Sequence, residues 1–521
     1  MTVGNYCASQ NTSSERGLKQ LSAQGYQEEH QNRAMAESLQ ASPCTAEPED
    51  GTTTIADWLA DMEPFGPQYL RAVTAGKALR CFARSLWGKD FLYHQSFVRK
   101  KKVGVFWSHS WRTPPWKKAG LLLFWYNGNV ATIVATLGAV VMFLLCCCDI
   151  LPGFMKSPWT GPPRKLPFGA WSTLTGSLLY FMVLTGYRSQ RTVWLDWMCI
   201  NQKDEAKKMK GVLSLGANIK TSEKMLVLWD ETWIHRLWCV FELSAFLKCQ
   251  QMQAGQTLTV LPVFIFPFWL ANFLMLMLIM TANVMIPLGN LTYVVLGFLG
   301  LLFCSIFWER VLTTHFSQIS ALNERLASFS FKDTMCTCCT KSHKDAYGHH
   351  IQCDRELLSQ CMSTWFGSEE ACEASVSSAL AGVLKEKLGA RFPFPYWMLL
   401  SAGLPWVWGY MDFAAARVRG EEWEEFAAIV MNGVAWWANI GPAITTFSVT
   451  LIWKLRSCRR SMVLRWLCRL VIVVMQLIGH AYYRVLQDFV PGRLVNEAIF
   501  FVTSLIAAVT AWRLRREGYI Q

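Results

Sequence analysis

The sequence predicts an α-helical multi-pass membrane protein of about eight spans, with a cytosolic α/β module built on a parallel sheet. First, 52% of the 521 residues are apolar, and the mean hydropathy is +0.21. Second, the apolar residues gather in long blocks that are almost free of charge, and about 20 such residues cross a bilayer as a helix. Third, short apolar strands alternate with helical segments around residues 193–264, which indicates a parallel sheet.

The apolar blocks define the expected spans. They are 121–148, 169–187, 265–285, 291–308, 393–415, 426–453, 470–483 and 494–512. With an even number of spans, the basic flanks fall on one face; they include Lys117 and Lys118 before the first span and Arg513 after the last. The positive-inside rule assigns that face to the cytoplasm. We therefore expect an integral membrane protein with both termini in the cytoplasm, in a membrane that the sequence does not identify.

The chain is expected to divide at the ends of these blocks. The segments are a disordered N-terminal tail (1–54), a cytosolic helical segment with the first strand of the module (55–118), a transmembrane hairpin (119–187), the α/β module (188–264), a second hairpin (265–308), a cytosolic Cys/His-containing helical segment (309–391), a four-span bundle (392–513) and a cytosolic tail (514–521).

Charge and cysteine usage exclude two classes of protein. The net charge is +13, but Lys and Arg cluster beside the apolar blocks, and no motif for reading nucleic acid is present. The expected partner is therefore the lipid bilayer and not nucleic acid. The 18 cysteines lie partly inside apolar blocks, which is not the pattern of a secreted disulfide framework. The polar first 50 residues predict no cleavable signal peptide.

The module itself is predicted from its strands and helices. Residues 55–98 have helix-like periodicity, and a strand is expected at 103–107. Further strands are expected at 193–200, 225–229 and 258–264, with helices at 205–222 and 236–248 between them. Strands that alternate with helices favour parallel pairing.

Four segments of this module resemble known domains. Residues 103–110 (VGVFWSHS) resemble the first strand of TIR domains, and 194–205 (WLDWMCINQKDE) are similar to the signature of the fungal heterokaryon-incompatibility (HET) domain. Residues 236–243 (RLWCVFEL) resemble the Trp-Cys-x-x-Glu-Leu helix of plant TIR domains, and 259–264 (TVLPVF) the strand that follows. The resemblance covers about 80 residues and implies a membrane-anchored TIR/HET-like protein of signalling or stress response. It departs from TIR domains in carrying two expected spans between the first two strands.

The resemblance also implies a possible activity. Glu242 matches the glutamate with which TIR enzymes hydrolyse NAD+, and a carboxylate can stabilise the oxocarbenium-like state in which the glycosidic bond breaks. Ligands of open α/β sheets bind beyond the carboxyl ends of the strands. Residues expected to bind NAD+ are Trp238, Ser108, Ser110, Arg112 and Asp196.

A second interpretation of the same residues requires no catalysis. Trp238, Phe241 and Ala245 also form an ordinary buried helix stripe, and Glu242 can be its edge or an ion-pair partner. Asp196 can cap a turn. Many TIR and HET domains act by self-association, so the resemblance equally implies a homo-oligomer.

A cluster of thiols and imidazoles follows the fourth expected span. Zinc takes four N or S ligands in a tetrahedron, and closely spaced Cys and His can supply them. A loop with unpaired thiols is the alternative. The candidate ligands are Cys336, Cys338, Cys339, His343 and Cys353, with His349 and His350 nearby.

Ionisable residues inside spans suggest an alternative function. Asp412, His480 and Glu497 lie in expected spans, where charge is costly and usually functional. A transporter or channel with a cytosolic regulatory module is therefore the alternative to the signalling protein.

Overall fold

The computed structural model describes most of the chain from Ile55 to Glu517. The described ranges are 55–88, 92–99, 102–153, 155–156, 167–250, 257–285, 290–327, 330–340, 342–344, 353–387, 394–455 and 461–517. The expected N-terminal tail and residues 518–521 lie outside the described residues.

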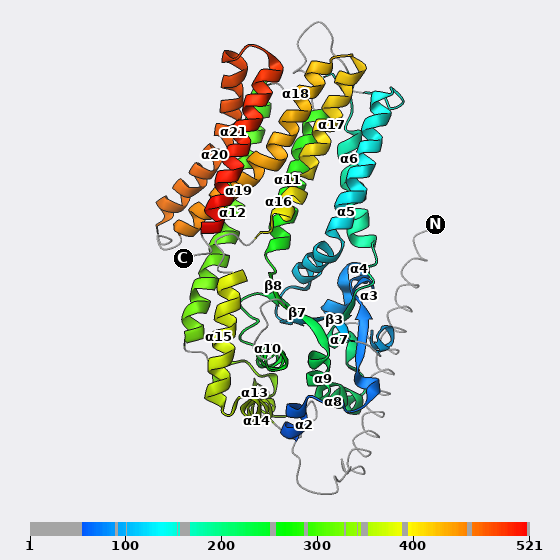
Figure 1. Ribbon diagram of the computed structural model, residues 1–521, viewed down its shortest axis with the longest axis vertical. Helices are drawn as coiled ribbons and strands as arrows, with labels where there is room; N and C mark the ends of the chain where they lie inside the picture. The colour runs from blue at the N-terminus through cyan, green and yellow to red at the C-terminus, as the bar shows by residue number, and fades with distance from the viewer. Residues whose placement is uncertain are drawn as a thin grey trace, which may run out of the picture. The chain divides into compact units, whose positions relative to one another are not determined.

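Six strands form one mixed sheet, of which β3, β7 and β8 are labelled in Figure 1. They are β1 Arg71–Thr74, β2 Phe97–Val98, β3 Val103–His109, β6 Thr192–Trp194, β7 Ser222–Trp229 and β8 Leu258–Pro262. Their order is β2-β1-β6-β3-β7-β8. Strands β6, β3, β7 and β8 pair in parallel, whereas β1 pairs antiparallel with β2 and β6. The expected strands of the module therefore lie side by side.

Two expectations about this part of the chain are wrong. Helix-like periodicity was expected throughout 55–98, but β1 and β2 form within it. These strands are too short to carry a period of their own, and they are fixed by pairing, β1 with β6 and β2 with β1. The strand expected at 193–200 ends at Trp194, and Asp196–Cys199 forms the short helix α7.

Short helices connect the strands. They are α2 Ile55–Asp61, α3 Ala75–Ala78, α4 Arg80–Ala83, α8 Glu205–Leu213, α9 Leu215–Lys220 and α10 Leu237–Cys249. After α12 Asn290–Ala327, the chain adds α13 Thr337–Thr340, α14 Asp354–Phe366 and α15 Glu369–Lys387. The 3-10 turns are η1 Pro67–Tyr69, η2 Arg84–Trp87, η3 Tyr93–Gln95 and η4 Phe331–Asp333, and a separate hairpin pairs β4 Met155–Lys156 with β5 Pro167–Phe168.

Side chains of the sheet alternate between two apolar cores. In β7, Met225, Val227 and Trp229 belong to the core that includes helices α9, α10, α14 and α15. Leu226 and Leu228 belong to the opposite core, which includes the first turns of α5 and α11. Because both faces are buried, the central strands have the nearly continuous apolar sequence typical of parallel sheets.

Five helices of the described residues are long and apolar enough to cross a membrane. Their spanning segments are Pro115–Cys147 of α5, Ile265–Ala282 of α11, Trp423–Lys454, Met462–Phe489 of α20 and Arg493–Arg513 of α21. Helix α11 continues to Met285 and α21 to Glu517, and the third segment joins α18 Trp423–Val434, the π-helical turn η5 Ala435–Ile440 and α19 Gly441–Lys454. The chain is thus mostly helical, with a small mixed sheet and several candidate spans.

Two of the eight expected spans take another form. Residues 169–187 become α6 Trp171–Gly186, which has 16 residues and packs along α5. Residues 393–415 divide into α16 Tyr396–Ala402 and α17 Leu404–Arg419, which meet at Gly403. The fourth expected span lies within α12 Asn290–Ala327, which continues well beyond Trp308. Both α6 and α17 are shorter than the roughly 20 residues that cross the hydrocarbon core.

Helix α6 is held by α17 through a cap and a close contact. The Asp412 carboxylate accepts hydrogen bonds from the backbone N–H groups of Ser172 (2.7 Å) and Thr173 (3.0 Å), at the start of α6. One turn further, a methyl group on Gly176 would lie 2.6 Å from the fully buried ring of Trp408. The two helices therefore approach each other at a glycine.

We expect Gly176→Ala to destabilise the protein by about 1–3 kcal/mol, because the added methyl group must displace a buried indole. The apparent melting temperature of the detergent-solubilised protein measures the effect. Gly186→Ala on the same helix is the matched control, since nothing lies within 4 Å of a methyl group there. Equal melting temperatures for the two variants would contradict the close contact.

Candidate functional site

Most residues of the predicted ligand site gather where the parallel strands end. Ser108 lies near the end of β3, Ser110 follows that strand, and Asp196 follows β6. Asp230 follows β7 in the same way. Helix α10 brings Glu242 to Ser108. The carboxyl ends of parallel strands meet at one edge of the sheet, which is why these residues lie together.

Glu242 lies in a hydrogen-bonded cluster with Ser108 and Trp233. The Ser108 hydroxyl, which is fully buried, donates to Glu242 Oε2 at 2.5 Å. The Trp233 indole N–H donates to the same hydroxyl at 3.0 Å. Burial raises the pKa of Glu242 to about 8, with a further contribution from the charge of Asp196; the Ser108 bond and Arg236 oppose the shift. At neutral pH this carboxyl group is therefore mostly protonated.

Asp196 is occupied by its neighbours. Its Oδ2 accepts from the Trp111 indole N–H at 2.9 Å, and its Oδ1 accepts from the Trp197 backbone N–H at 2.7 Å. Burial raises its pKa, although both hydrogen bonds oppose that shift. Asp196 thus begins the α7 turn and fixes an indole ring.

Ser110 joins β3 to the loop after β7. Its hydroxyl is hydrogen-bonded to the Thr232 hydroxyl at 2.7 Å, and its carbonyl accepts from the buried Lys118 ammonium group at 3.0 Å. Asp230 accepts hydrogen bonds from the hydroxyls of Thr113 (2.5 Å) and Thr232 (2.7 Å). Among the described residues, these groups form a network in which each polar side chain has a partner.

The remaining two predicted residues, Trp238 and Arg112, are not bonded to the Glu242 cluster through their side chains. The Trp238 indole N–H donates to Asp354 at the start of α14, at 3.2 Å. The indole that joins the Glu242 cluster is Trp233 instead. Arg112 is exposed, and its backbone N–H donates to Ser110 Oγ.

Sequence reasoning missed Lys118, Asp230, Thr232 and Trp233. Asp230 was recognisable, because it directly follows an expected strand as Ser108 and Ser110 do. Lys118 was assigned only to the basic flank of a span, and nothing in the sequence indicated that it would be buried against Ser110.

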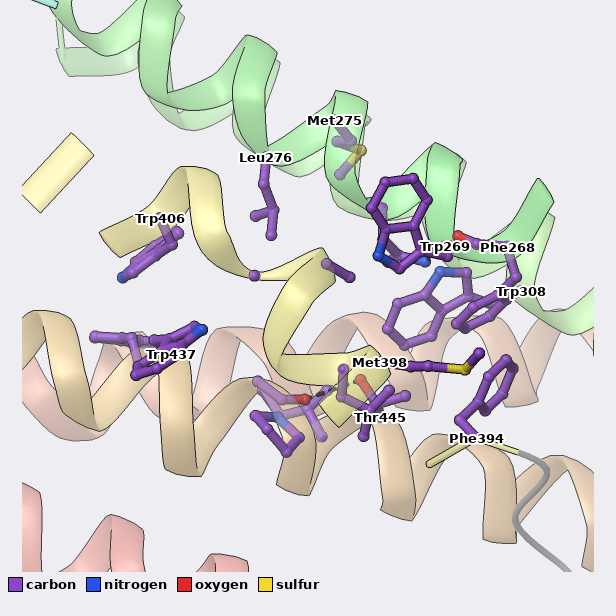
Figure 2. A pocket seen from close by; sticks show the side chains of 18 of the residues that line it. Phe268, Trp269, Met275, Leu276, Trp308, Phe394, Met398, Trp406, Trp437 and Thr445 are labelled. Atoms are coloured by element: carbon purple, nitrogen blue, oxygen red, sulfur yellow. Dashed lines mark hydrogen bonds between the residues drawn. The ribbon is translucent and has the colours of Figure 1, made fainter. Parts of the chain in front are cut away.

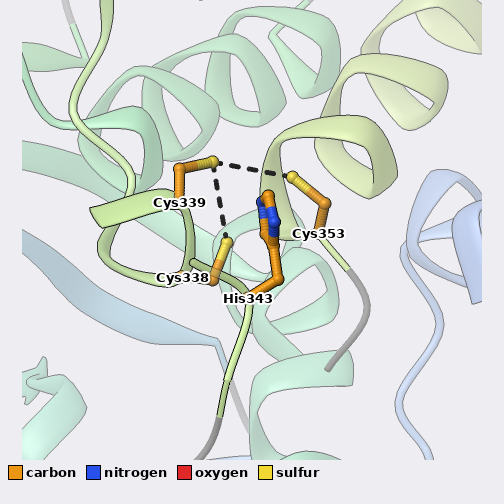
Figure 3. A group of neighbouring side chains, drawn as sticks. All are labelled: Cys338, Cys339, His343 and Cys353. Carbon is orange, nitrogen blue, oxygen red and sulfur yellow. Dashed lines mark hydrogen bonds between the residues drawn. The ribbon is translucent and has the colours of Figure 1, made fainter. Parts of the chain in front are cut away.

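The structure brings together four of the five predicted metal ligands. The ligand atoms of Cys338, Cys339, His343 and Cys353 all lie within 4.8 Å of one another (Figure 3). Cys336 instead groups with Cys338 and Asp354. His349 and His350 lie outside the described residues.

A cavity of about 180 Å³ lies among the helices of the apolar region. Figure 2 shows Trp406 and Trp437 toward one end and Phe268, Trp308 and Phe394 toward the other. Its lining contains no Asp, Glu, Lys or Arg among the described residues, and its main polar side chains are Asn272, Thr445, Gln476 and His480.

The buried carboxylates of these helices are bonded away from the cavity. Glu497 accepts hydrogen bonds from Asn432 (2.9 Å) and from the Tyr483 hydroxyl (2.5 Å). Glu309 forms a buried ion pair with Arg469 at 2.7 Å. Asp412 caps α6. These groups therefore serve helix packing.

Comparison with known proteins finds no relative: no family model matches the chain, and neither curated proteins nor solved structures contain a match.

We expect the raised pKa of Glu242 to make stability depend on pH. In the unfolded chain the group ionises near its ordinary value, so between that pH and about 8 the folded state holds a proton that the unfolded state has lost. Stability therefore falls as the pH rises through this window. Glu242→Gln cannot ionise, so its apparent melting temperature will fall less between about pH 5 and pH 9 than that of wild type, a difference that corresponds to roughly 3–5 kcal/mol of stability.

The matched control is Glu205→Gln, because the side chain of Glu205 is 62% exposed on α8. This variant will follow the wild-type curve. Parallel curves for wild type and Glu242→Gln would show that Glu242 is ionised in the folded protein.

Proposed function

We propose that the protein is a membrane-anchored, TIR/HET-like signalling or stress-response protein whose α/β module acts by self-association. The observation that carries the proposal is that the predicted ligand-binding groups at the carboxyl ends of the strands are already hydrogen-bonded within the protein. The groups that would meet a ligand there, Ser108, Ser110 and Asp196, are bonded to other side chains of the protein. A site of this kind favours an interaction module over an enzyme.

The attachment of the module to the membrane helices supports the same proposal. Only residues 110–114 separate β3 from α5, and only 263–264 separate β8 from α11. Sheet and helices share one apolar core, and the Trp107 indole N–H donates to the Tyr126 hydroxyl of α5 at 3.0 Å. The basic flanks favour a cytoplasmic location for the module and both termini. A conformational change in these helices would then be transmitted directly to strands β3 and β8 of the module.

The edge strand β2 is the surface that we propose for self-association. It lies at one end of the strand order, and its side chains Phe97 and Val98 are 39% and 47% exposed. An edge strand offers unpaired backbone groups to a second chain.

We expect the purified full-length protein to self-associate in detergent, and Phe97→Lys with Val98→Lys to weaken this association about tenfold or more. Light scattering coupled to size exclusion measures the oligomer. Met209→Lys is the control, because this side chain is 59% exposed and belongs to α8, not to the sheet. A monomeric wild type, or equal loss in the control, would refute the proposed surface.

Hydrolysis of NAD+ is the second candidate, favoured by the position of Glu242 beside Ser108 at the strand ends. A protonated acid cannot stabilise an oxocarbenium ion as a carboxylate does, so catalysis would require a rearrangement that ionises Glu242. Any NAD+ consumption by the purified protein will disappear in Glu242→Ala without loss of expression. Equal turnover in both proteins would remove Glu242 from the mechanism, whereas robust Glu242-dependent turnover would make the module an enzyme.

The transporter or channel has less support. The cavity among the helices is lined by aromatic and aliphatic side chains, without a charged group among the described residues. The intramembrane carboxylates are bonded to other helices.

A further inference from the structure

Three short pieces of chain converge between α12 and α14. Helix α13 carries Cys338 and Cys339, the following turn carries His343, and Cys353 immediately precedes α14. Figure 3 shows the three thiols and the imidazole turned toward a common centre. Each residue offers one ligand atom, so the set contains three sulfurs and one nitrogen.

The spacing of these atoms fits a tetrahedral metal ion. Zinc–sulfur bonds are about 2.3 Å long, so two sulfurs on one zinc ion are about 3.8 Å apart. The Cys338 and Cys339 sulfurs are 3.9 Å apart, and those of Cys339 and Cys353 are 3.6 Å apart. Cys336 Sγ lies 3.0 Å from Cys338 Sγ, which is too close for a second ligand of the same ion.

The imidazole is the second, independent observation. His343 Nε2 is shielded from solvent and has no hydrogen-bond partner among the described residues. Ser342 and His343 also have left-handed backbone angles, with φ of 53° and 54°, which non-glycine residues adopt rarely. Strained turns of this kind concentrate at functional sites, where other bonds hold them in place.

Backbone groups support the sulfurs from outside. The Asp354 N–H points at Cys338 Sγ at 3.3 Å, and the His343 N–H donates to the Cys338 carbonyl at 2.8 Å. Such bonds orient metal ligands and stabilise thiolates.

We propose that Cys338, Cys339, His343 and Cys353 bind one zinc ion as a structural site. Four protein ligands leave no position open for water or substrate, so the ion would have no catalytic role. Thiolate and imidazole ligands in a tetrahedral set favour zinc over the harder divalent cations.

The site links the Cys/His segment to the α/β module. Met335 exchanges backbone hydrogen bonds with His235 and Leu237, at the start of α10. At the start of α14, Asp354 accepts from Trp238, and further along the ring of Trp365 stacks on Phe241 of α10 at 5.3 Å. Zinc would therefore fix α14 on α10, independently of whether the module assembles or hydrolyses NAD+.

The test uses full-length protein purified in detergent without chelator. Elemental analysis is expected to find one zinc per chain in wild type and little in Cys339→Ser or Cys353→Ser. Cys336→Ser is the matched control, because its sulfur neighbours the site but lies outside the tetrahedron; this variant will retain its zinc. Well-folded wild type with far less than one zinc per chain, or equal zinc loss in Cys336→Ser, would overturn the proposal.

A second measurement needs no variant. Alkylation of wild type, followed by mass spectrometry, will label the exposed Cys81 at once but Cys339 and Cys353 only after zinc is chelated. Labelling of all three at the same rate before chelation, or recovery of Cys339 and Cys353 as a disulfide, would contradict a metal site.

Discussion

The structure depends on one constraint: two strands of the sheet continue almost directly into membrane helices. Strand β3 leads into α5 and β8 into α11, and parallel strands direct their carboxyl ends to the same edge. That edge must therefore adjoin the beginnings of both helices. One face of the sheet consequently shares its apolar core with α5 and α11, so Leu226 and Leu228 are buried together with residues 121–124.

This junction explains the chemistry of the strand ends. In most open α/β sheets the carboxyl edge is accessible to ligands and water. Here the first turn of α5 adjoins it, and Lys118 donates to the Ser110 carbonyl. Buried polar groups must find partners within the protein, because an unsatisfied group costs about 1–3 kcal/mol. Ser108 is bonded to Glu242 and Thr232 to Asp230 in this way, and burial raises the pKa of Glu242.

The sequence predicts those parts whose pattern is local. Strands β3 and β7 are recognisable from their nearly continuous apolar sequence, which follows from burial of both faces. The cluster of Cys338, Cys339, His343 and Cys353 is recognisable because residues that are close in sequence need little folding to meet. The short strands β1 and β2 depend on pairing with distant segments, which periodicity cannot reveal. The choice of Trp233 over Trp238 as the partner of Ser108 depends on how the loop after β7 turns. Apolar blocks also overestimate the number of spans, because α6 and α17 bury their apolar residues against other helices.

The covered surfaces of the module argue for β2 as its contact with other chains. One face packs on α5 and α11, the other on α10 and α14, and β8 contacts α15. The β2 edge is the other end of the strand order, and β2 contacts the turn η1. Three ladders connect that edge to β3, through β1 and β6, and β3 continues into α5. A second copy bound at β2 would thus act on the strand that carries the membrane helix, without disturbing either core.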